Sequence, residues 1–162
     1  MKNYSAHMSS MNLTLRLVFG VVLLFGISSC KKKDEDPFVN KEPFIELVNV
    51  TPVQAVEFSD SLIFTVHYRD NDGDLGENTA TVKNLFLTDN RVNVEYAYRI
   101  QQLAPSGSNV PIEGDLLVVL KSVARTDTTL AQQVATFSLY VVDRAGHKSN
   151  TVVSVPVTIA AQ

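Results

Sequence analysis

From Phe44 onward, apolar and polar residues alternate with a period of two in short runs, separated by clusters of Gly, Asn, Asp, Pro and Ser. A period of two places neighbouring side chains on opposite faces of an extended chain, so this pattern predicts β-strands and no helix here. We expect seven strands, at residues 45–50, 61–69, 81–88, 92–100, 116–123, 134–142 and 151–159.

Strand number and spacing then predict the fold class. Seven short strands without an internal repeat favour an all-β, seven-stranded immunoglobulin- or fibronectin-like antiparallel β-sandwich over residues 44–162. A different antiparallel sandwich, or a barrel, is the alternative. The chain has one cysteine and no tryptophan, so the cysteine pair and buried tryptophan of antibody domains are missing. The prediction therefore rests on strand count and spacing.

The alternation also predicts which side chains face the core. In residues 92–100, Tyr96 and Tyr98 share a face with apolar residues, so we expect both in the core. The alternative is an exposed aromatic pair that stacks on a sugar or a protein partner. Residues 116–123 are apolar enough for burial on both faces. Pro156 cannot donate a backbone hydrogen bond, so it predicts an edge position for the last strand.

The N-terminal pattern is different. An apolar run of eleven residues, 17–27, follows the only two charged residues of this region, Lys2 and Arg16. Such a run is too short to cross a bilayer core of about 30 Å, but a basic start with a short apolar middle is typical of an export signal. We therefore predict that residues 1–29 are a cleaved signal helix. The alternative is an ordinary core helix.

The only cysteine, Cys30, directly follows this segment. The sequence Ile27-Ser28-Ser29-Cys30 resembles the bacterial lipobox, which implies that Cys30 is lipidated and becomes the first residue of the mature protein. Two or three acyl chains hold a protein on a membrane almost permanently. The alternative for Cys30 is a buried thiol.

Residues 30–43 combine a block of charges with two prolines and little apolar content, which predicts a flexible tether. Residues 31–43, fully extended, reach roughly 40 Å. Within this tether, Lys33 followed by Asp34, Glu35 and Asp36 resembles the surface-export signal of Bacteroidota lipoproteins. A solvated spacer without an export role is the alternative.

The densest polar segment is residues 69–78, with four carboxylates in the eight residues from Asp70 to Glu77. Alternate carboxylates on a tight loop suit Ca²⁺, a hard cation that takes six to eight oxygen ligands. We propose Asp70, Asp72 and Asp74 as ligands. The segment is not an EF-hand, because its twelfth position is not glutamate.

In an immunoglobulin-like topology the loop after residues 61–69 lies at the same end as the loop that joins the last two strands. We therefore add Asp143 to the predicted calcium site. The alternative is a plain acidic turn, because Asp-Gly is ordinary turn chemistry and solvated carboxylates repel each other weakly. No other metal or cofactor is predicted.

Composition excludes several classes. Residues 30–162 carry 12 Lys and Arg against 17 Asp and Glu, a net charge of about −5, because residues 1–29 contain Lys2 and Arg16 and no acid. A mildly acidic chain without a basic stripe gives no electrostatic basis for nucleic-acid binding. The sequence has no Gly-x-Ser-x-Gly motif, and His67 and His147 are too far apart for a zinc motif. We therefore predict that the protein is not an enzyme.

The lipobox, the segment Asp-Asn-Asp-Gly-Asp-Leu-Gly at 70–76 and the turn Asp-Arg-Ala-Gly-His-Lys-Ser-Asn at 143–150 together resemble the small Ig-like lipoproteins of Bacteroidota. The resemblance implies a protein that is lipid-anchored to the bacterial outer membrane and faces the cell surface, with a domain for adhesion, assembly or binding of a protein or glycan. It implies no catalytic residues. The alternative function is a carbohydrate-binding accessory lipoprotein of a polysaccharide-import system.

Overall fold

The computed structural model describes residues 40–162, and within this range it is all-β, without a helix. No segment of this range forms a helix long and apolar enough to cross a membrane. The predictions for the signal helix, for Cys30 and for Lys33, Asp34, Glu35 and Asp36 fall outside the described residues.

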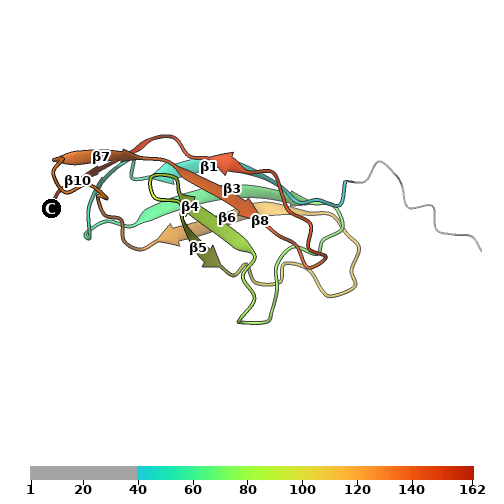
Figure 1. Ribbon diagram of the computed structural model, residues 1–162. Coiled ribbons are helices and arrows are strands. Elements are labelled where there is room, and N and C mark those ends of the chain that lie inside the picture. The colour runs from blue at the N-terminus through green and yellow to red at the C-terminus, as the bar shows by residue number, and fades with distance from the viewer. Residues whose placement is uncertain (1–39) are drawn as a thin grey trace, which may run out of the picture. The chain divides into compact units, whose positions relative to one another are not determined.

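The described residues form ten strands instead of the expected seven. Figure 1 labels most of them. They are β1 (Phe44–Thr51), β2 (Gln54–Val56), β3 (Leu62–Asp70), β4 (Leu85–Asp89), β5 (Val94–Tyr98), β6 (Ile112–Leu120), β7 (Gln132–Ala135), β8 (Phe137–Val141), β9 (Val152–Val153) and β10 (Val157–Ala160).

The strands are arranged in three sheets. Sheet A has the order β1-β3-β6, sheet B has the order β2-β10-β7, and sheet C has the order β5-β4-β8-β9. Sheets A and C are antiparallel throughout. In sheet B, β10 is antiparallel to β7 and parallel to β2.

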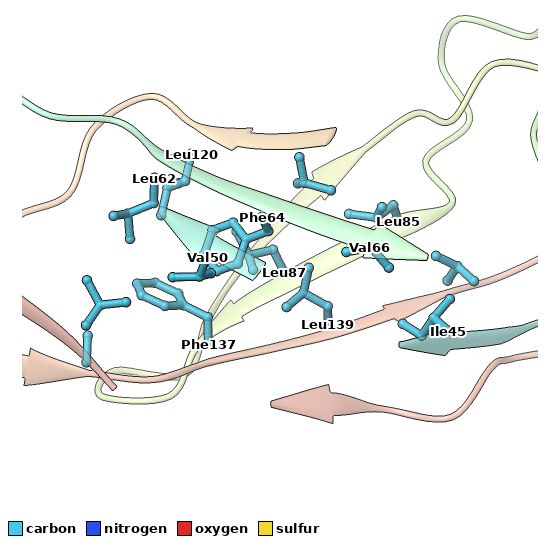
Figure 2. Close-up of a cluster of buried hydrophobic side chains, with 14 of the residues drawn as sticks. Ile45, Val50, Leu62, Phe64, Val66, Leu85, Leu87, Leu120, Phe137 and Leu139 are labelled. Carbon is cyan, nitrogen blue, oxygen red and sulfur yellow. The ribbon is translucent and has the colours of Figure 1, made fainter. Parts of the chain in front are cut away.

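Sheets A and C pack face to face over one apolar core (Figure 2). Strand β3 contributes alternate residues to it, and Leu62, Phe64 and Val66 are fully buried, as their period of two predicts. Phe64 meets Phe137 of β8 edge to face, with ring centroids 5.4 Å apart, a favoured aromatic geometry. The contact joins the two sheets at the centre of the core.

Two of the predicted strands are each divided between two sheets, which accounts for part of the higher strand number. The run 134–142 breaks at Thr136, so that β7 belongs to sheet B and β8 to sheet C. The run 151–159 breaks at Ser154, whose hydroxyl accepts a hydrogen bond from the Phe137 N–H at 3.0 Å. A serine side chain thus takes the place of a strand neighbour along β8.

The prediction of an edge position at Pro156 is wrong for the strand that follows. Pro156 lies in the break between β9 and β10, and β10 is the central strand of sheet B. A break suits proline because no strand partner requires its missing N–H group there.

The expected burial of both faces of residues 116–123 is also wrong. Val118 and Leu120 are buried, whereas Leu117 is 70% exposed. Leu117 lies on the outer face of sheet A, on the side away from the core.

Strand β5 differs from the prediction in burial. Tyr96 and Tyr98 lie opposite the core residues Leu87 and Leu85 of β4, so they share the core-side face of sheet C as predicted. Tyr96 is nevertheless 36% exposed, and Tyr98 is partly buried. Sheet C has four strands and sheet A three, so the outermost strand of sheet C lacks cover from the other sheet.

Candidate functional site

The acidic segment is a tight loop that begins at the last residue of β3, Asp70. The side chain of Leu75 in this loop is fully buried and anchors the loop in the core. Gly76 has φ of +90°, and a Cβ atom there would lie 2.2 Å from the carbonyl oxygen of Gln101. Only glycine fits such a position, because it has no Cβ and tolerates positive φ. The loop conformation is therefore fixed by packing.

This loop brings three carboxylates together. One carboxylate oxygen from each of Asp70, Asp72 and Asp74 lies within 4.8 Å of the others. The Oδ1 atoms of all three are buried and have no hydrogen-bond partner. The Oδ2 atom of Asp70 accepts a hydrogen bond from the Leu75 N–H at 2.7 Å, and that of Asp74 accepts one from the Ala145 N–H at 3.1 Å. In Asp70 and in Asp74, one carboxylate oxygen thus accepts a hydrogen bond and the other has no hydrogen-bond partner.

The turn after β8 packs against this loop, as predicted from the sequence for these two loops. The backbone N–H of Arg144 donates to the Asp74 carbonyl at 3.3 Å. The Arg144 guanidinium donates to the carbonyl oxygens of Gly76 at 2.8 Å and Gly73 at 3.4 Å. Arg144 therefore binds the loop through its backbone carbonyls. No role for Arg144 was predicted from the sequence, although the residue belongs to the turn 143–150.

Asp143 lies near the three aspartates but outside the converging group. Its carboxylate accepts hydrogen bonds from His147, at Oδ1 from the backbone N–H (2.8 Å), while Oδ2 lies 2.9 Å from the ring Nδ1. These contacts with Asp143 raise the pKa of His147. Both oxygens of Asp143 thus have partners within its own turn.

Burial and mutual repulsion perturb the aspartates. The pKa of Asp70 is raised to about 6, chiefly because the carboxyl is buried, with further increases from Asp72 and Asp74; the Leu75 N–H lowers it in part. The pKa of Asp74 is also raised, by burial first and then by the charges of Asp143 and Asp72. The loop therefore holds negative charge at a cost in free energy.

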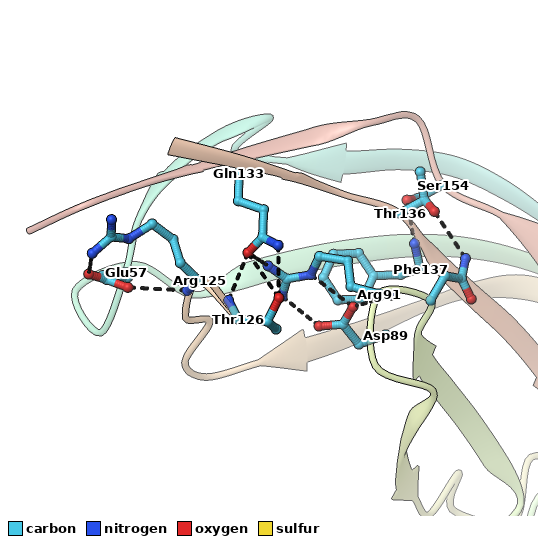
Figure 3. A network of polar contacts seen from close by, with 10 residues as sticks. Glu57, Asp89, Arg91, Arg125, Thr126, Gln133, Thr136, Phe137 and Ser154 are labelled. Carbon is cyan, nitrogen blue, oxygen red and sulfur yellow. Dashed lines mark hydrogen bonds and ion pairs between the residues drawn. The ribbon is translucent and has the colours of Figure 1, made fainter. Parts of the chain in front are cut away.

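Other buried carboxylates of the domain are compensated (Figure 3). Glu57 receives the Arg125 guanidinium at 2.7 Å, and Asp89 receives that of Arg91 at 2.6 Å. Arg91 also donates to Gln133 of β7 at 3.1 Å. No ion pair between described residues includes the three loop aspartates. The carboxylates of the acidic loop therefore lack the arginine partners that neutralise Glu57 and Asp89.

A second feature lies on the open flank, which we define as the space between the edge strands β5 and β6. It contains a groove of about 290 Å³ with a largely apolar lining, formed mainly by Leu85, Tyr98, Ile100, Leu103, Leu116 and Val118. On the opposite flank, the Asn150 side chain bonds both the N–H and the carbonyl of Ile45, each at 2.8 Å. That flank is thus closed by a side chain at this point, and the open flank has an accessible apolar groove.

Comparison of the chain with protein-family models, curated proteins and solved structures finds no significant match.

Proposed function

We propose that this chain is a lipid-anchored protein of the bacterial outer membrane, with a non-enzymatic immunoglobulin/fibronectin-like β-sandwich that binds a partner. In this proposal residues 1–29 are removed, Cys30 carries the lipid, and residues 30–43 hold the domain off the membrane. The lipobox at Cys30 supports the anchor. The charged block from Lys33 to Asp36 supports orientation toward the cell surface.

One structural observation carries the binding role: the core-side face of β5 is uncovered next to an unpaired edge of β6. Exposed fractions are 46% for Val94 and 36% for Tyr96, although both face the same side as the core residues of β4. A fourth strand in sheet A would cover this face. Edge strands with unpaired backbone groups accept such a strand from another chain.

The partner that fits this flank is an extended polypeptide segment. Its backbone pairs with the free edge of β6, and its alternate apolar side chains enter the groove that Tyr98 lines. This mode gives affinity through backbone hydrogen bonds and specificity through the groove.

A second candidate is the carbohydrate-binding accessory protein. The exposure of Tyr96 favours it, because aromatic faces accessible to solvent stack on sugar rings. A glycan array separates the two: selective glycan binding that is lost in Tyr96→Ala supports the carbohydrate function and contradicts the peptide one.

The binding role is tested with a displayed peptide library selected on the soluble mature chain, residues 30–162 with Cys30→Ser. We expect extended apolar peptides whose affinity falls at least tenfold in Tyr98→Ala, which removes an aromatic ring from the lining of the groove. Val48→Lys, at a position that is 61% exposed in β1, is the matched control and leaves binding unchanged. Equal loss in the control variant contradicts the proposed flank.

The anchor is tested in a bacterial host that acylates lipoproteins. We expect incorporation of a labelled fatty acid in the native protein and none in Cys30→Ala, which is released or remains uncleaved. Protease treatment of intact cells then distinguishes a surface orientation from a periplasmic one. Normal membrane partition of Cys30→Ala refutes the anchor.

A further inference from the structure

We propose that Asp70, Asp72 and Asp74 form a calcium-binding site. This inference depends on neither the lipid anchor nor the open flank, because it rests on the geometry of one loop and the turn packed against it. Three carboxylate oxygens within 4.8 Å of one another surround a point that a single cation can reach.

The convergence of three carboxylates does not by itself distinguish a calcium site from an acidic turn. The burial of Asp70 does. The residue is only 1% exposed, and its Oδ1 has no hydrogen-bond partner. Buried polar atoms are satisfied in the great majority of cases, and a buried carboxylate oxygen without a donor requires a counter-charge. The Oδ1 atoms of Asp72 and Asp74 are buried and unsatisfied in the same way. A bound cation would satisfy all three.

Within residues 40–162, no cationic side chain forms a hydrogen bond or an ion pair with these three Oδ1 atoms. Arg144 is held against this loop, and the hydrogen bonds of its guanidinium go to the carbonyl oxygens of Gly73 and Gly76. In contrast, Arg125 and Arg91 bond directly to the carboxylates of Glu57 and Asp89. Arg144 therefore stabilises the loop conformation through backbone carbonyls, and the three Oδ1 atoms remain available to a bound ion.

The donor set selects the kind of ion. All three ligands are carboxylate oxygens, and no histidine or cysteine belongs to the group in the described part of the chain. Hard oxygen donors favour Ca²⁺ or Mg²⁺ over zinc and copper. Ca²⁺ is the better fit because it accepts several carboxylates together with backbone carbonyls and water in irregular geometry, whereas Mg²⁺ demands a near-ideal octahedron and keeps most of its water.

Calcium would also tie the two loops together. Asp74 is already bonded through Oδ2 to the Ala145 N–H, across 71 residues of sequence. An ion on its other oxygen would connect Asp70 at the end of β3 with the turn 143–147 through this one side chain. We therefore expect bound calcium to stabilise the whole domain, because binding to the folded state alone shifts the unfolding equilibrium.

The experiment uses the mature chain, residues 30–162 with Cys30→Ser, freed of metal by a chelator. Isothermal titration with CaCl₂ and, separately, MgCl₂ measures affinity, and thermal unfolding with each ion measures stabilisation. Extracellular modules bind calcium with Kd of roughly 10⁻⁴ to 10⁻³ M, so the titration extends to about 10 mM. We expect one calcium per chain, a higher Tm in calcium, and at least tenfold weaker binding of magnesium.

The variants Asp72→Asn and Asp74→Asn keep the size of the side chain and remove one charge each. We expect each to weaken calcium binding at least tenfold and to reduce the calcium-dependent rise in Tm. Asp115→Asn is the matched control, since it removes one charge from a side chain that is 60% exposed on β6, and it binds calcium like the native chain. Folding of every variant is verified by its unfolding transition in chelator.

Absence of calcium binding up to about 10 mM, or native affinity in Asp72→Asn, overturns the proposal. Equal affinity for magnesium overturns the assignment to calcium. Loss of binding in Asp115→Asn as well as in the loop variants would show a nonspecific charge effect and would equally refute the site.

Discussion

Replacement of Asp70 by asparagine tests the electrostatics of the acidic loop without any ligand. Asparagine has nearly the same shape as the protonated carboxyl and can still accept the hydrogen bond of the Leu75 N–H. In chelator, where no ion compensates the charge, the variant therefore reports the free energy that ionised Asp70 costs the folded state.

The magnitude follows from the pKa of Asp70, which is raised from 3.8 to about 6. Each unit corresponds to about 1.4 kcal/mol, so ionisation destabilises the folded state by about 3 kcal/mol above pH 7. Because the folded-state pKa lies above the unfolded one, the stabilising contribution of the protonated form is complete below pH 3.8 and is lost as pH rises through about 6. Asp70→Asn is thus more stable than the native chain by about 3 kcal/mol at pH 7.5 and about equal to it near pH 3.5.

The assay is chemical unfolding of both proteins in chelator at several pH values, followed by circular dichroism because the chain has no tryptophan. The difference between the two proteins isolates Asp70 from groups with lowered pKa, such as Glu57 and Asp127, whose contributions have the opposite pH dependence. A variant less stable than the native chain at pH 7.5, or a difference that does not change with pH, would refute the electrostatic reasoning. In about 1 mM calcium we expect the difference to shrink by up to about 1.4 kcal/mol, because the ion stabilises the native chain more than the variant and a Kd of roughly 10⁻⁴ M corresponds to that free energy.

Three further predictions concern the fold, each measured as the change in unfolding free energy. Gly76→Ala lowers the free energy of unfolding by about 2 kcal/mol or more, because φ is +90° and the new Cβ would lie 2.2 Å from a carbonyl oxygen. Gly107→Ala is the control and lowers it less, because φ is +79° there but no atom lies close to the new Cβ. Phe137→Ala removes a fully buried ring from the core and costs about 3–5 kcal/mol, whereas a loss below 1 kcal/mol would contradict its place there. Asn150→Ala removes two hydrogen bonds to β1 and costs about 1–2 kcal/mol; an unchanged midpoint would show that this closure is dispensable.

The candidate site was partly predictable. The spacing of Asp70, Asp72 and Asp74 marks a cluster of oxygen donors, and loop topology indicated that Asp143 lies nearby. Which oxygens have partners depends on residues about 70 positions away, such as the Ala145 N–H on Asp74. The contact of Asp143 with His147 lies within four residues, yet nothing in the pattern indicated that both its oxygens are occupied.

The sequence by itself determined the all-β class and the inward face of β3, because a period of two is a local property of an extended chain. It also indicated a turn at Asp72-Gly73, because Asp-Gly is ordinary turn chemistry. Only the tertiary structure decided the burial of the other strands. Tyr96 faces the core side yet remains exposed, because sheet A has one strand fewer than sheet C. Periodicity selects a face, but burial requires another layer opposite that face, and the number of strands in that layer is set by pairings between distant segments.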